Sequence, residues 1–344
     1  MCLAYFEEGS DKFHQLNHNR AEFGSGMNIT GALTEPLVRL IAFHNACNRN
    51  IKVSFGALEM LSRARASAGA VATALPTGSE PWGSQTRWRN LEQPVKDASS
   101  FLAEAGLARA TAAFEDYATG AKAEFDRAGL TEIRPKHDGT SAFFGFDATV
   151  GIEAKSIKSL VKMANYFDVA RNCIVHRSNR ASRQRIELGA DPDLAITLSK
   201  GPNRNAKWTL SLPVVSEGVV IEWQPRHAIM ASDVYYRCAT MLDHTLVQLM
   251  GARGLTRMAA HWCFLADPPA PSSAKLSAEV MVRAQLTSRY GVRELASVQT
   301  IALLRDIGMW DDVRALFDRR YPNGPETSLP ARRRARASAS PARR

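Results

Sequence analysis

The stretch Arg171-Asn172-Cys173-Ile174-Val175-His176 ends a long amphipathic pattern, and the rest of the chain is interpreted outward from it. Apolar residues recur at helical spacing before and within it, at Ile157, Leu160, Ala164, Phe167 and Ile174. This spacing predicts one apolar face of a helix. Asn165, Asn172 and His176 fall on a second, polar face, because seven and eleven residues are close to whole numbers of turns. A helix that only fills a core does not need this second face.

Arg171 and His176 are residue types suited to chemistry on a phosphate. Arginine offers a permanently charged fork of donors to phosphate oxygens, and histidine can move a proton near neutral pH. RNA can be cut by its own 2′-hydroxyl when charge on the phosphate is balanced and a proton is moved. These two residues are therefore a candidate RNA-cleaving pair.

The spacing of the pair limits how it can act. Five residues along a straight helix turn through about 500°, so Arg171 and His176 would point roughly 140° apart. Either the helix ends near His176, or a second copy of the stretch approaches across a two-fold axis. The following Arg-Ser-Asn-Arg (177–180) suits a helix end, because Asn and Ser favour turns and caps.

Arg-Asn-x-x-x-His at the end of an amphipathic helix resembles the signature of the HEPN superfamily, whose small helical bundles include many RNases of toxin, antiphage and RNA-processing systems. The run 167–176 is similar to the subset found in bacterial defence-type proteins, and the resemblance covers roughly residues 95–252. Members of this subset often place a small polar residue and then Gly after the His. This chain instead has Arg177, Ser178 and Asn179 at that point.

The resemblance implies a homodimeric helical bundle whose motif helices meet at the two-fold axis. It implies metal-independent cleavage of RNA, with no cofactor, leaving 2′,3′-cyclic phosphate ends. In that scheme His176 acts as general base or general acid, Arg171 stabilises the charged phosphorane, and Asn172 orients the histidine or the phosphate. The same resemblance implies a toxin or antiphage setting, with an antitoxin or another defence-system protein as a further partner.

Structural roles for the same residues remain open on the sequence. Asp168 stands three residues before Arg171, which is contact spacing on a helix. A histidine at a helix C-terminus also interacts favourably with the helix dipole. Glu115 or Asp116, on the preceding predicted helix, could instead hold Arg171 or polarise His176. A non-catalytic dimerisation and binding module is therefore the second hypothesis.

Basic residues follow the motif at a high density. Arg177, Arg180, Arg183 and Arg185 would hold an RNA backbone, and so would Lys200, Arg204 and Lys207 further on. Apolar residues alternate over 194–198 and 208–212, and Val219–Trp223 is a third candidate strand. We therefore expect a small antiparallel β insertion over about 190–224.

The chain as a whole is predicted to be mainly α-helical. The expected parts are a loose leader (1–30), N-terminal helices and a linker (31–92), a HEPN-like helical bundle with the β insertion (93–254), a C-terminal helical module (274–322) and a disordered basic tail (323–344). Within them we expect helices over 35–66, the second starting near Phe55, over 96–127, and from Ser232 to near Gly251. The C-terminal helices could alternatively belong to a DNA-binding regulator.

Composition points to a soluble, cytoplasmic protein. The 344 residues are 45% hydrophobic and 23% charged, and no apolar run reaches the length of a membrane span. The five cysteines lack zinc spacing, and the N-terminus does not resemble a signal peptide. The formal net charge is +10, and six arginines of the tail contribute to it. No phosphate-binding loop, dinucleotide fingerprint or nucleophile elbow occurs.

Overall fold

The structure is a computed structural model whose described residues are mainly helical, as the sequence predicts. The described residues are 29, 31–66, 92–129, 155–192, 194, 211–267, 269, 276–292 and 296–322. The leader, most of the linker before residue 92, the connection 130–154, residues 195–210 of the β insertion and the tail 323–344 lie outside them.

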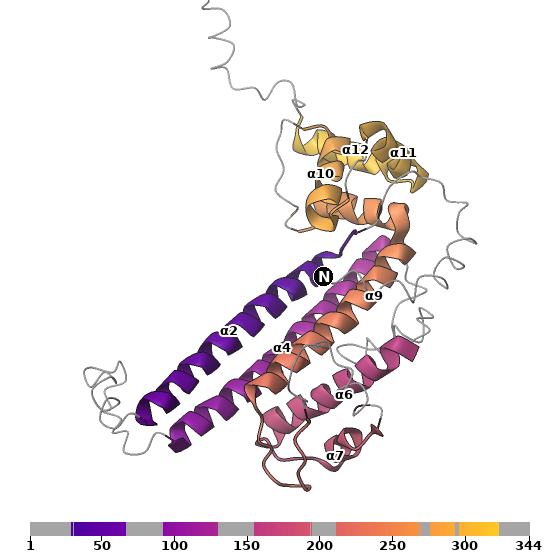
Figure 1. Cartoon of the computed structure of the whole chain (residues 1–344). Coiled ribbons are helices and arrows are strands. Elements are labelled where there is room, and N and C mark those ends of the chain that lie inside the picture. Colours follow the sequence, from indigo (N-terminus) through magenta and orange to yellow (C-terminus); the bar gives the residue numbers. More distant parts are fainter. Residues whose placement is uncertain are drawn as a thin grey trace, which may run out of the picture. The chain divides into compact units, whose positions relative to one another are not determined.

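The helices fall into two compact units, one comprising Leu33–Leu246 and the other including the residues from Val247 onward. In chain order the elements are α2 (Glu35–Ala66), α4 (Glu92–Ala128), α6 (Lys155–His176), α7 (Arg183–Gly189), α9 (Pro225–Ala260), the π-helix η4 (His261–Leu265), α10 (Ala278–Tyr290), α11 (Ser297–Asp306) and α12 (Trp310–Arg320). Helices α2, α4, α6, α7 and most of α9 form the first unit (Figure 1).

Helix α2 packs antiparallel along α4, and glycines in α4 allow the close approach. A Cβ atom at Gly106 would lie 3.0 Å from Ile51 Cδ1 and 2.9 Å from Ala228 Cβ, and one at Gly120 would lie 2.8 Å from Pro36 Cγ. The prediction of two helices within 35–66 is wrong, because α2 is continuous. No proline interrupts the region around Phe55, and a single interior glycine is tolerated in a helix.

The spacing of Phe101, Ala105, Ala108 and Ala112 in the sequence predicts one apolar face of α4, but the helix buries a different face. Phe101 is 72% exposed. The buried face instead includes Leu107, Phe114 and Tyr117, all at 0% exposure. Alanine occurs on both sides of this helix, since Ala110 is buried and Ala112 is exposed, so the alanine spacing did not mark the buried face.

Helix α9 lies against α2, α4 and α6, and its contacts set the packing of the first unit. Phe114 stacks on Tyr235 with ring centroids 4.9 Å apart, the Tyr117 hydroxyl donates to the Ala239 carbonyl at 3.1 Å, and the Tyr235 hydroxyl donates to the Ala164 carbonyl at 3.4 Å. These contacts join α4, α6 and α9 around an aromatic core.

The start of α9 differs from the prediction, whereas its interruption at Gly251 agrees with it. The helix begins at Pro225, a residue suited to a first helical turn. Ser232, the predicted N-cap, lies inside the helix at 3% exposure, and its Oγ is 2.9 Å from Nδ1 of His44. Gly251 has φ 53° and ψ −167°, which interrupts the helical backbone where the sequence predicted an end.

The N-terminus of α2 is anchored on a buried carboxylate of α9. Asp243 is 0% exposed, and its Oδ2 accepts from the Thr34 backbone N–H at 3.0 Å. Its Oδ1 accepts from the Thr34 hydroxyl. Burial raises the pKa of Asp243 to about 6, although the Thr34 hydrogen bonds act in the opposite direction.

Residues 211–224 do not supply the predicted β strands within the part of the chain that the structure describes. Val219–Trp223 makes one isolated antiparallel bridge, between Val220 and Arg180. The Ala181 N–H donates to the Val219 carbonyl at 2.9 Å, and the Ile221 N–H donates to the Asn179 carbonyl at 3.0 Å. This segment therefore pairs with the residues that follow α6.

The C-terminal module contains the short helices that the sequence predicted. Helix α11 is followed by a turn at Gly308, which has φ 69°, and then by α12. Buried Leu304 and Phe317 contribute to its core. An ion pair joins α11 to the residues after Gly251, since Arg253 Nη2 lies 2.6 Å from Asp306 Oδ1.

Candidate functional site at the end of helix α6

Helix α6 ends at His176, and a left-handed turn follows immediately. Ser178 has φ 51° and Asn179 has φ 60°. The Asn179 N–H donates back to the Cys173 carbonyl at 2.9 Å, and the Arg177 N–H donates to the same carbonyl at 3.1 Å. This pattern is typical of a helix C-terminus that closes with a left-handed residue, a position where glycine is preferred. The exit turn is therefore made without the glycine of the HEPN-like subset.

The side chain of Asn179 holds this exit turn in place. Asn179 is 6% exposed, and its Nδ2 donates to Glu104 Oε1 at 2.7 Å and to the Ile221 carbonyl at 2.8 Å. Its Oδ1 accepts from Trp223 Nε1 at 2.9 Å. One amide thus joins the end of α6 to α4 and to the segment 211–224. The three partners are far apart in the sequence, so only the preference of Asn for left-handed turns pointed to this residue.

Arg171, in the last turns of α6, contacts one residue of α4 and one residue of its own helix. Its Nη1 donates to Asn172 Oδ1 at 2.9 Å, and its Nη2 lies 3.9 Å from Glu115 Oε2. The side chains of Arg171 and Glu115 are 27% and 34% exposed. Glu115 is therefore the α4 acid that reaches Arg171, at the long end of the range for an ion pair. Such a partly exposed ion pair contributes little stability.

The other predicted supporting acids have different neighbours. Asp116 Oδ2 lies 3.7 Å from Arg39 Nη2 on α2, so it does not support Arg171. Asp168 is half-buried on α6. Burial raises the pKa of Tyr235 well above its usual value, and the Asp168 carboxylate adds a smaller contribution in the same direction.

Asn172 and His176 are exposed at the end of the helix. They are four residues apart and therefore share one face of α6. Val175 beside them is 51% exposed.

Three of the four arginines after His176 are exposed on the surface, and one is not. Arg180 Nη1 donates to the Gly218 carbonyl at 2.9 Å, and Arg183 Nε donates to Glu187 Oε1 at 2.9 Å. Arg177 is exposed. Arg185, in contrast, is 2% exposed, so its assignment as an RNA-binding residue is wrong. Lys200, Arg204 and Lys207 lie outside the described residues.

Arg185 is buried because α7 turns it toward two aromatic rings and two oxygen acceptors. Its Nη2 donates to the Tyr166 hydroxyl and to the Pro213 carbonyl, each at 2.6 Å. Its guanidinium carbon lies 5.4 Å from the Tyr166 ring centroid and 5.6 Å from that of Trp223. Aromatic faces attract a desolvated guanidinium. The sequence could not show that Tyr166 and Trp223 would meet around this residue.

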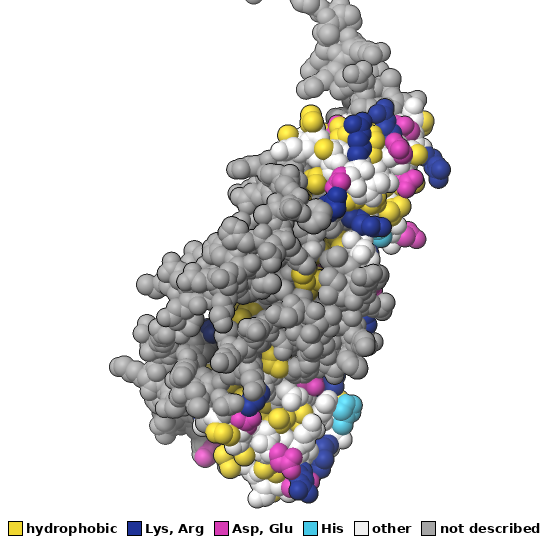
Figure 2. Space-filling view, turned by 90° about the vertical axis from the view of Figure 1, so that its right-hand side faces the viewer, with side chains coloured by type: hydrophobic (Ala, Val, Ile, Leu, Met, Phe, Trp, Pro, Cys, Tyr) yellow, Lys and Arg dark blue, Asp and Glu magenta, His cyan; other side chains and the backbone are white. Residues whose placement is uncertain are grey.

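The basic residues do not merge into one surface on the side drawn in Figure 2. There, among the described residues, Lys and Arg side chains are interspersed with acidic and apolar ones.

Comparisons with protein-family models, with curated proteins and with solved structures give no match to this chain. Within the described residues, no cluster of three or more His, Cys, Asp or Glu side chains could hold a metal ion. The described helices include none that is long and apolar enough to cross a membrane.

Proposed function

We propose that this chain is a metal-independent endoribonuclease of HEPN type that cuts RNA through attack by the 2′-hydroxyl. The observation that supports it best is the end of α6. The helix stops at His176, Asn172 and His176 are exposed on one face, and Arg171 lies beside Asn172 at 2.9 Å. The exit turn is anchored on α4 through Asn179, so the end of the helix is held in place.

In the proposed reaction the 2′-oxygen forms a bond to phosphorus and the bond from phosphorus to the 5′-oxygen breaks. His176 takes the 2′-hydroxyl proton as general base, or gives a proton to the leaving 5′-oxygen as general acid. Either role is typically worth on the order of 10²–10⁴ in rate. Arg171 exchanges its long contact with Glu115 for the phosphate, whose charge it stabilises. The products carry a 2′,3′-cyclic phosphate and a 5′-hydroxyl.

The angle between the two side chains favours a site shared between two protomers. Arg171 and His176 point roughly 140° apart on a straight helix, and α6 is helical through both. A second copy across a two-fold axis would bring His176 of one protomer toward Arg171 of the other, and would cover the exposed Val175. A cytoplasmic role in a toxin or antiphage system, controlled by an antitoxin or defence partner, follows from the resemblance.

The test compares cleavage of total RNA in EDTA by the wild-type chain, His176→Ala and Arg171→Ala. His244→Ala is the matched control, because His244 is an exposed histidine on α9. We expect wild type and the control to cut, and both motif variants to lose activity by roughly 10²–10⁴-fold, with unchanged thermal unfolding. Cleavage by His176→Ala at the wild-type rate would contradict the proposal.

A mixture of Arg171→Ala with His176→Ala tests the shared site. If each site takes its arginine and its histidine from different protomers, half of the sites in a mixed dimer are intact. After subunit exchange in an equal mixture, half of the dimers are mixed. About a quarter of wild-type activity should then return. No recovery in mixtures shown to exchange would mean that the pair belongs to one protomer.

The second candidate is a non-catalytic dimerisation and RNA- or partner-binding module. One observation favours it: Glu115 already contacts Arg171, the residue that the catalytic scheme needs for the phosphate. It predicts salt-sensitive RNA retention that is unchanged in His176→Ala and accompanied by no cyclic-phosphate products.

A further inference from the structure

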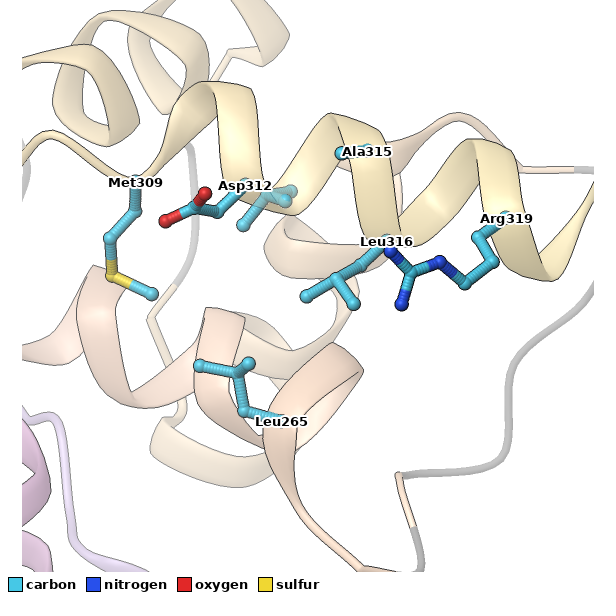
Figure 3. A pocket seen from close by; sticks show the side chains of 7 residues that line it. Leu265, Met309, Asp312, Ala315, Leu316 and Arg319 are labelled. Carbon is cyan, nitrogen blue, oxygen red and sulfur yellow. The ribbon is translucent and has the colours of Figure 1, made fainter.

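The C-terminal module carries a groove that is distinct from the end of α6. It has a volume of about 240 Å³ and lies between Leu265 of η4 and one face of α12. Figure 3 shows Leu265 facing this helix, with Leu316 opposite it. Leu265 is 51% exposed, so the groove leaves apolar surface open to solvent.

The two ends of the groove carry opposite charges. Asp312 and Arg319 line it on the same helix and are seven residues apart, which is close to two turns, or about 10 Å along the axis. Within the part of the chain that the structure describes, neither residue forms an ion pair. Their neighbours on the other face do, since Arg314 Nε lies 4.0 Å from Asp318 Oδ2.

This arrangement is complementary to itself. If two copies of α12 lie antiparallel with a two-fold axis near Ala315 and Leu316, Asp312 of each copy faces Arg319 of the other. Both ion pairs then form together, as an isologous interface requires. Ala315 is exposed and small, which allows the two helices to approach closely at the axis. Leu265 and Leu316 of the two copies would fill the centre.

We propose that this groove binds α12 of a second copy of the same chain, in antiparallel orientation. A nucleic acid does not suit the surface, because α12 carries Asp311 and Asp312 in its first turn as well as Arg319 and Arg320 in its last, so no uniformly basic strip follows the groove. Each copy contributes an 11-residue helix, so the contact is small and belongs to the weak class of interfaces. The proposal is independent of the RNase assignment and of the dimer expected at α6.

Cross-linking of the full-length chain tests the position of the two-fold axis. Ala315→Cys places a thiol at the axis, and Arg314→Cys, one residue away, places a thiol outside the groove lining. The unsubstituted chain reports the background from native cysteines, of which Cys173, Cys238 and Cys263 are buried. With a short bismaleimide we expect roughly tenfold more cross-linked dimer for Ala315→Cys than for Arg314→Cys. Equal yields would overturn the proposal.

Charge reversal tests the pairing itself, in the Ala315→Cys background. Asp312→Arg alone places two like-charged pairs across the axis, and so does Arg319→Asp alone, so each should lower the yield roughly tenfold. A mixture of the two variants restores opposite charges, and so does the double variant Asp312→Arg/Arg319→Asp. Recovery of cross-linking in both is the expected result. Yields that do not respond to charge reversal would overturn the antiparallel pairing.

Discussion

The end of α6 and the short helix α7 lie close together in the chain and both carry arginines, but they place them in different environments. Arg171 is partly exposed, with one long ion pair to Glu115. Arg185 is 2% exposed, and its Nη2 donates two hydrogen bonds inside the protein. Arginines that stand close together in a basic stretch can therefore differ in burial and in partners. Under the proposed function, Arg171 is the one that exchanges its partner for a phosphate.

The largest effect on stability is expected from Arg185→Ala. The substitution leaves the Tyr166 hydroxyl and the Pro213 carbonyl without their donor and opens a cavity between two rings. We expect the free energy of unfolding to fall by about 3–5 kcal/mol, measured by urea denaturation. Arg183→Ala, two residues away and exposed, is the matched control and should change it by less than about 0.5 kcal/mol. Equal effects would mean that Arg185 is not buried in solution.

A second prediction concerns the dependence of stability on pH. The buried side chains of Asp243 and His227 change the free energy of unfolding in opposite directions as pH rises. Burial raises the pKa of Asp243 to about 6, so its contribution to stability is present at low pH and lost as pH rises through about 6. Burial lowers the pKa of His227 to about 4, so its contribution is present at neutral pH and lost as pH falls toward 4. Each group changes the free energy of unfolding by about 3 kcal/mol over the pH range between its unfolded and folded pKa values. Because the two changes have opposite signs, they largely cancel in the wild-type protein.

Single substitutions should reveal the two opposed slopes. Between pH 4 and 6.5, the unfolding free energy of Asp243→Asn should rise with pH more steeply than that of wild type. His227→Gln should show the reverse, a fall with rising pH. Chemical denaturation at half-unit pH intervals measures both. Slopes equal to the wild-type slope in both variants would show that neither group titrates in this range.

A smaller and stabilising effect is expected at the exit turn. Ser178 has φ 51°, a conformation that costs a non-glycine residue roughly 1–2 kcal/mol. Ser178→Gly relieves this strain but raises the conformational entropy of the unfolded chain. We therefore expect the free energy of unfolding to rise by about 0.5–1 kcal/mol. Thermal unfolding measures it, with Ser182→Gly as a contrast, because Ser182 caps α7 by accepting from the Arg185 N–H. A loss of stability in Ser178→Gly would contradict the assigned turn.

Periodicity predicted those parts of the fold that depend on contacts near in sequence. The end of α6 at His176, the interruption at Gly251 and the Gly308 turn all follow from local spacing and turn residues. The continuous α2 and the early start of α9 did not, because tertiary packing on α4 extends helices past weak local stop signals.

The candidate site was predicted only in its local part. Arg171, Asn172 and His176 share one helix, so their placement follows from its period. The roles of Asn179 and Arg185 depend on Glu104, Trp223 and Tyr166, which come from other elements. No single-sequence pattern pairs such distant residues, and the same limit left the choice between Glu115 and Asp116 open.

The most direct test of the proposed reaction is the chemistry of the RNA ends. One RNA oligonucleotide and its fully 2′-O-methylated counterpart are incubated in EDTA with wild type and with His176→Ala, and the product ends are mapped. We expect wild type to cut only the unmodified RNA, leaving 2′,3′-cyclic phosphate and 5′-hydroxyl ends, and His176→Ala to cut neither RNA. Cleavage of the methylated RNA, or wild-type cleavage by His176→Ala, would contradict it.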